Sequence, residues 1–161
     1  MKRVIIAGAD EPVDLRTNLR LVDAISTSGT HLLQACGGKG LCATCHVYIR
    51  AGAEQLSPVT PRERSSLRML NERRDNSRLA CQAKVVGDGV EVALPSGRYL
   101  TASTDLEALV GRRADERILH PVDGRVLIEP GKIITRSRIR ELAAVDVDLA
   151  EVKSHSLTLP H

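Results

Sequence analysis

The 161-residue sequence predicts an α+β fold, with one mixed domain over residues 1–97 and a small mixed β/α module over residues 105–161. The length suits one domain of about 100 residues plus an appendage. Short apolar runs typical of strands alternate with two stretches of helical periodicity in the first part. The breaker Pro95-Ser96-Gly97 closes that part, and residues 98–104 are expected to be a linker.

The elements of the first domain follow from local patterns. Thr60 can cap a helix whose first position is Pro61, and Leu67 and Leu70 should then face inward. Gly87-Asp88-Gly89 is typical of a tight turn between two strands. In chain order we expect strand 3–7, strand 13–17, helix 19–27, glycine-rich loop 35–45, strand 46–50, helix 62–72, strand 78–86 and strand 89–94.

The second segment has a different character. It should contain a helix at 105–113, strands at 116–119 and 125–129, a helix at about 136–144 and a final strand at about 149–153. Its histidines have no carboxylate or cysteine at ligand spacing, so we expect His120, His155 and His161 on the surface. The chain has no Phe or Trp and two Tyr, so its core must be aliphatic.

Charge and hydropathy narrow the class of protein. The net charge of +3 is too small to indicate nucleic-acid binding. No stretch approaches the roughly 20 apolar residues needed to span a membrane. The apolar run from Val4 ends before Asp10 and Glu11, which argues against a secretory signal. We therefore expect a cytoplasmic protein with neither a nucleic-acid nor a membrane partner, in a compartment where clustered cysteines more often bind metal than form disulfides.

All four cysteines belong to one motif. Five residues separate Cys36 from Cys42, two separate Cys42 from Cys45, and 35 separate Cys45 from Cys81. The spacing is close to the plant-type C-x4-C-x2-C plus a distant Cys, which supplies the four thiolates of a [2Fe–2S] cluster. Glycines between the cysteines let the chain approach such a cluster closely and point amides at its sulfurs.

Three alternatives compete with this interpretation. Structural zinc usually needs two tight cysteine pairs, and only Cys42 and Cys45 form one. Two disulfides are disfavoured by the expected compartment. Four unrelated buried thiols would be an unusual coincidence, since three lie within ten residues among glycines.

Residues 1–95 resemble the vertebrate-type (adrenodoxin-like) [2Fe–2S] ferredoxins, on the segments ACGGKGLCATCHVYI and RLACQ. The resemblance implies a β-grasp fold and one [2Fe–2S] cluster held by Cys36, Cys42, Cys45 and Cys81, with the first three in an exposed loop. It also implies a one-electron carrier, not an enzyme, between a ferredoxin reductase and an acceptor oxidoreductase. An alternative is a redox-responsive binding or protective protein whose cluster state controls association with a partner enzyme.

Residues near the motif carry further expectations. His46 should tie the loop to the rest of the fold by a hydrogen bond, and Thr44 should face a sulfur or shape the turn. Arg78 should pair with an acidic group and so fix the strand that bears Cys81. Lys39 is expected to be solvated.

One feature departs from the family. Its members carry an acidic docking helix before the fourth cysteine, whereas arginines outnumber acids here in PRERSSLRMLNERRDNSR. The acidic docking face is therefore lost or moved, and a partner with an acidic patch is the better fit.

The C-terminal segment weakly resembles a small barrel module of the largest subunit of bacterial RNA polymerase. The shared pattern is a P-x-x-G turn followed by G-x-V-L-x-E-x-G-x-x-I-T, seen here from Pro121 to Thr135. This likeness suggests a fold and not a role in transcription. We expect the module to dock a partner, to form an oligomer, or to cover the cluster.

Overall fold

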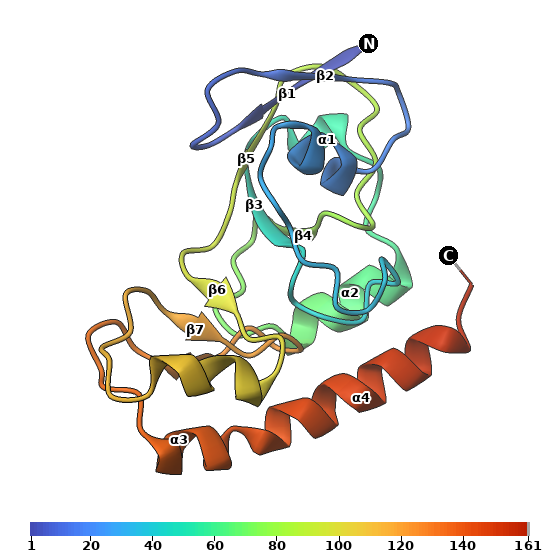
Figure 1. Cartoon of the computed structure of the whole chain (residues 1–161). Helices are drawn as coiled ribbons and strands as arrows, with labels where there is room; N and C mark the ends of the chain where they lie inside the picture. Colours follow the sequence, from blue (N-terminus) through green and yellow to red (C-terminus); the bar gives the residue numbers. More distant parts are fainter. Residues whose placement is uncertain (161) are drawn as a thin grey trace.

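A computed structural model describes residues 1–160, and a five-stranded sheet organises the first part of the chain (Figure 1). Its strands are β1 (Lys2–Ile6), β2 (Val13–Leu15), β3 (His46–Ala51), β4 (Ser77–Leu79) and β5 (Val90–Ala93). The order across the sheet is β2-β1-β5-β3-β4. The central β1–β5 pair is parallel, and the other pairs are antiparallel. The predicted α+β, β-grasp organisation is confirmed.

Two helices complete this part, together with the short 3-10 turn η1 (Ala53–Gln55). Helix α1 (Leu21–Thr27) buries one apolar side against the sheet. Helix α2 (Pro61–Met69) begins as predicted, because the hydroxyl of Thr60 accepts a hydrogen bond from the backbone N–H of Glu63. After α2 the chain enters β4, which ends at Leu79 and is therefore shorter than the predicted strand 78–86. A turn follows, in which the N–H of Ala83 donates to the carbonyl of Leu79.

The second part has its own three-stranded sheet and three helical segments. They are β6 (Arg98–Tyr99), η2 (Ser103–Leu109), β7 (Ile118–Leu119), β8 (Val126–Ile128), α3 (Arg136–Glu141) and α4 (Ala143–Leu157). The sheet order is β6-β7-β8. Residues 98–104 were expected to be a linker, and the first two of them form β6 and pair with β7.

Helix α4 overturns one prediction, because the final strand expected at 149–153 is helical. The predicted strand, residues 149–153, lies within the 15-residue helix α4. The burial follows a helical period instead: Val145 and Leu149 are buried, whereas Val147 is 59% exposed. Packing of this stripe against the second core decides the conformation.

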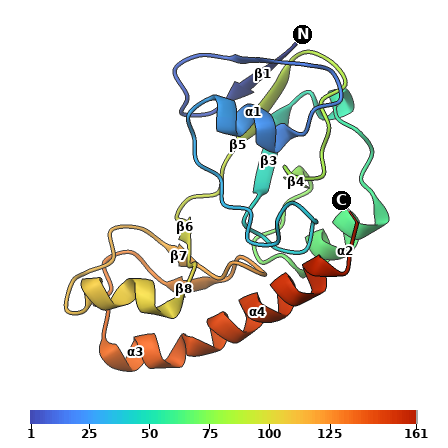
Figure 2. The same ribbon diagram turned by 45° about the vertical axis from the view of Figure 1, so that its right-hand side comes forward.

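Two aliphatic clusters form the interior. The first lies between the five-stranded sheet and α1, and the second lies among the short sheet, η2, α3 and the start of α4. Helix α4 leaves the second cluster and runs toward the first part, where its last turn lies beside α2 (Figure 2). The C-terminal helix thereby connects the two parts of the molecule.

Candidate metal centre

The four cysteine side chains converge from two segments. The loop before β3 brings Cys36, Cys42 and Cys45, and the turn after β4 brings Cys81. Each of the four residues is at most 2% exposed, and none forms a disulfide. The loop was expected to be exposed, but its cysteines are buried because other segments pack against it.

The thiols form two pairs. The Sγ atoms of Cys45 and Cys81 lie 3.3 Å apart, and the thiols of Cys36 and Cys42 are close enough to shift each other's pKa. The Cys42 side chain lowers the pKa of Cys36 to about 5, and the backbone N–H groups of Leu41, Lys39 and Gly40 act in the same direction. The bond from Cys45 lowers the pKa of Cys81.

The partner thiols behave oppositely. The hydrogen bond to the partner sulfur and burial raise the pKa of both Cys42 and Cys45. In each pair, therefore, one sulfur favours the thiolate form and the other keeps its proton. A bound metal ion would displace that proton. Two thiolate pairs fit the two irons of a [2Fe–2S] cluster, with two ligands for each.

The loop backbone also suits an anionic group. The N–H of Leu41 lies 3.4 Å from the Cys36 sulfur. Gly38 and Gly40 have φ of +81° and +73°, and a Cβ at Gly40 would lie 2.9 Å from the Gln82 side chain. Only glycine adopts this backbone there without strain. The loop can therefore turn its amides toward the sulfurs, as such a cluster requires.

A buried ion pair anchors the segment that carries Cys81. Arg78 makes two hydrogen bonds to the carboxylate of Glu63, at 2.7 and 3.1 Å, and the N–H of Leu79 donates to the same carboxylate at 3.0 Å. The Glu63 side chain is 0% exposed and that of Arg78 is 11% exposed. The predicted acidic partner of Arg78 is thus confirmed. Sequence reasoning missed Glu63, because an acid in the first turn of a helix usually faces solvent.

Residues beside the cysteines make the predicted kinds of contact. The Nε2 atom of His46 lies 2.8 Å from the hydroxyl of Ser77 on β4, which confirms the tie. Burial lowers the pKa of His46 to about 4, and the nearby Arg74 acts in the same direction. The hydroxyl of Thr44 accepts from the N–H of Ala35 and lies 3.0 Å from the Cys42 sulfur, so it both shapes the turn and faces a sulfur.

The C-terminal end of α4 contacts the cysteine loop directly. The hydroxyl of Ser156 donates to the carbonyl of Cys36 at 2.6 Å. The ammonium of Lys39 donates to the carbonyls of Ser156 and Leu159. The prediction of a solvated Lys39 is therefore wrong, because this lysine caps carbonyls at the end of a helix.

The prediction that His120 lies on the surface is also wrong. It is 1% exposed instead of lying on the surface. The N–H of Val122 donates to its Nδ1 atom, so its proton is on Nε2, which lies 2.9 Å from Asp148 on α4. The adjacent carbonyl of Pro121 accepts from the N–H of Ala43 in the cysteine loop. Sequence spacing offered no signal for the contact between His120 and Asp148; His161 lies outside the described residues.

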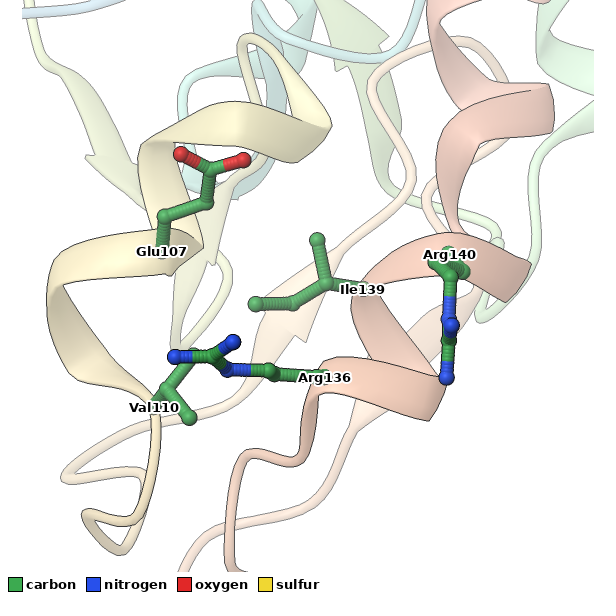
Figure 3. Close-up of a pocket in the computed structure, with 5 residues that line it drawn as sticks. All are labelled: Glu107, Val110, Arg136, Ile139 and Arg140. Carbon is green, nitrogen blue, oxygen red and sulfur yellow. The ribbon is translucent and has the colours of Figure 1, made fainter.

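A hollow of about 410 Å³ in the second part is separate from this centre (Figure 3). Glu107 and Val110 of the η2 region face Arg136 and Ile139 of α3 across it, and Arg140 completes the lining. It contains no cysteine. Among the helices of residues 1–160, none is long and apolar enough to cross a membrane.

Comparison with known proteins identifies the family. The model for the "2Fe-2S iron-sulfur cluster binding domain" matches residues 4–86. The 2Fe-2S ferredoxin-5 of Aquifex aeolicus is 33% identical over 96 residues, covering 59% of this chain and 100% of the relative. Putidaredoxin of Pseudomonas putida is 31% identical over 97 residues, covering 57% and 91%.

A solved structure agrees with the sequence matches. The reduced form of a cysteine-to-serine variant of putidaredoxin from Pseudomonas putida superposes with a TM-score of 0.51 at 30% identity, covering 58% of this chain and 96% of that chain. The family match stops at residue 86, so much of the second part lies outside it. The chain belongs to the [2Fe–2S] ferredoxin family, whose members bind one such cluster and carry electrons without being enzymes.

Proposed function

We propose that Cys36, Cys42, Cys45 and Cys81 hold the cluster, with the pair Cys36–Cys42 on one iron and Cys45–Cys81 on the other. When bound, the cluster supplies a centre that accepts and releases one electron. The single observation that carries the assignment is the convergence of four buried thiols into two pairs. The chain's own part is to exclude water, to hold the sulfurs as thiolates and to direct loop amides at them.

The proposal is tested on protein purified without oxygen. Iron and acid-labile sulfide are measured per chain, and an EPR spectrum is recorded after reduction with dithionite. Two irons, two sulfides and a rhombic spin-one-half signal support the site. Zinc, or four free thiols without metal, would refute it.

The redox partners are a ferredoxin reductase on one side and an acceptor oxidoreductase on the other. Putidaredoxin, a relative, has been solved in a covalent complex with putidaredoxin reductase. Helix α2 presents Arg64 and Arg68 to solvent, and Arg73 and Arg74 follow it on the surface. Charge complementarity therefore favours partners with an acidic patch. A cytoplasmic location stays a prediction from the N-terminal sequence, in which the apolar run ends before Asp10.

The domain organisation is also part of the proposal. The ferredoxin domain spans residues 1–97, and residues 98–104 link it to a docking or oligomerisation module at residues 105–161. Arg98 and Tyr99 already pair within the second sheet. Two separate aliphatic clusters support the division. The likeness to an RNA polymerase module and a role in forming oligomers stay predictions.

A second candidate function is a redox-responsive binding protein. The observation that favours it is the hydrogen bond from Ser156 to the carbonyl of Cys36. A change in the conformation of the cysteine loop would alter this bond and so the position of α4. Binding of a ferredoxin reductase to the oxidised and the reduced protein separates the two. A carrier should show little difference, whereas a switch should show a change of about tenfold, or ~1.4 kcal/mol.

A further inference from the structure

Access to the cysteine loop is blocked on one side by the last turn of α4. Ser156 contacts the carbonyl of Cys36, and the ammonium of Lys39 is held by two carbonyls of the C-terminal segment. Arg62 of α2 also donates to the carbonyl of Pro160, at 3.1 Å. Figure 2 shows this end of α4 close to α2 and to the loop. A large partner cannot reach the loop here while these contacts persist.

A hollow of about 800 Å³ opens onto the centre elsewhere. Its wall includes Cys81, together with Gly38 of the loop and Gln82. The amide of Gln82 donates to the carbonyl of Gly38 at 3.0 Å and lies 3.5 Å from the Cys81 sulfur. The wall of the hollow therefore includes one of the four cysteines.

The hollow is basic. Arg20 and Lys84 are its charged lining residues, and no carboxylate belongs to the lining among residues 1–160. Their backbones pair as an antiparallel bridge, which keeps the two cations together. Arg20 has an acidic neighbour, since its Nη2 atom lies 3.6 Å from Asp23. That pair is about one-third exposed on both sides, so it offsets the charge only weakly.

The hollow also adjoins the basic helix. Thr60, the N-cap of α2, belongs to its lining. Arg64 follows one turn later, and its N–H donates to the carbonyl of Thr60. The hollow therefore lies at the N-terminal end of α2, the helix that carries Arg64.

We propose that electrons enter and leave through this hollow, and that redox partners dock there by placing carboxylates against Arg20 and Lys84. This inference rests on the proposed electron-carrier function. Positive potential around the opening would raise the rate of encounter with an acidic partner, and salt would lower it. Helix α4, which the family match does not include, limits access from its own side.

The test uses small inorganic oxidants of opposite charge on the reduced, cluster-loaded protein. Hexacyanoferrate(III) takes one electron and becomes hexacyanoferrate(II), while the protein is oxidised by one electron. Hexaamminecobalt(III) is the cationic counterpart. Second-order rates are measured by stopped flow for the parent, for the variant Arg20→Glu/Lys84→Glu, and for the milder Arg20→Gln/Lys84→Gln. The matched control is Arg136→Glu/Arg140→Glu, an equal charge change on the remote α3.

The expected result at low salt is a drop of at least about fivefold in the anion rate for the first variant and a rise in the cation rate. The glutamine variant should show a smaller drop, and the control should stay within about twofold of the parent. Added salt should lower the rate at which hexacyanoferrate(III) oxidises the parent. In the Arg20→Glu/Lys84→Glu variant, added salt should no longer lower this rate.

A binding measurement supplements the kinetics. Hexacyanochromate(III) is a paramagnetic anion that serves here as a probe of binding and not as an oxidant. It should broaden NMR signals of residues 57–60 more than those of residues 113–115. Equal broadening, or equal rate losses in the hollow and control variants, overturns the inference. Absence of any dithionite-reducible centre in the parent would instead overturn the proposed function.

Discussion

The buried pair between Glu63 and Arg78 should contribute strongly to stability. Glu63→Gln keeps the side-chain volume but removes the charge that Arg78 and the N–H of Leu79 share. Arg78 is only 11% exposed, so its charge would remain poorly solvated. Removing one partner of a buried pair costs about 3–5 kcal/mol. With an m-value of about 2 kcal/mol per M, the midpoint of urea unfolding should fall by about 1.5–2.5 M.

The assay is urea unfolding of the cluster-loaded protein followed by circular dichroism, without oxygen. Glu116→Gln is the control, because its pair with Arg98 is about half exposed and should contribute at most about 1 kcal/mol. Arg78→Met and the double variant complete a thermodynamic cycle, in which the double loss should be smaller than the sum of the single losses. A midpoint for Glu63→Gln equal to that of the parent would refute the reasoning.

Three further outcomes are expected. Cys81→Ala should lose most of the iron and sulfide per chain, because one iron would lack a thiolate. Ser156→Ala should lose one buried hydrogen bond, worth about 1 kcal/mol, and so speed hydrogen exchange of the loop amides by about fivefold, while Ser154→Ala on the exposed side should not. Leu106→Ala should cost about 2–5 kcal/mol in the second core, measured by thermal unfolding, whereas Leu157→Ala should cost less than about 0.5.

Each of these has a contrary result. Iron and sulfide at parental levels in the Cys81 variant would contradict its role as a ligand. Parental exchange in the Ser156 variant would mean that α4 does not hold the loop. An unchanged melting temperature for the Leu106 variant would mean that the second cluster does not act as a core.

Local patterns predicted much of the first part. Thr60 and Pro61 start α2 where expected, since a cap and a fixed φ act within one turn. The cysteine spacing predicted the cluster, because the chemistry of a [2Fe–2S] centre requires four thiolates. The same kind of reasoning failed at 149–153, which was predicted as a strand and lies in helix α4. There the packing of Val145 and Leu149 outweighs the local pattern.

Contacts between distant residues were beyond sequence reasoning. Lys39 and His120 were predicted to be surface residues because their partners lie far along the chain. Lys39 donates a hydrogen bond to the carbonyl of Leu159, and His120 is hydrogen-bonded to Asp148. Burial of a charged or polar side chain depends on such partners. The acid that pairs with Arg78 was expected, but only the packing of α2 against β4 identified Glu63.

Residue types and short-range spacing were enough to predict the cofactor class, the α+β organisation of the first part and the basic character of the helix before Cys81, because chemistry and backbone geometry constrain these features directly. They did not predict that α4 closes one side of the cysteine loop or that Arg20 and Lys84 line the open side, which became visible in the folded chain. The physical reason is that Ser156 and Cys36 are 120 residues apart, so their contact arises from the packing of two cores and leaves no periodic trace in the chain.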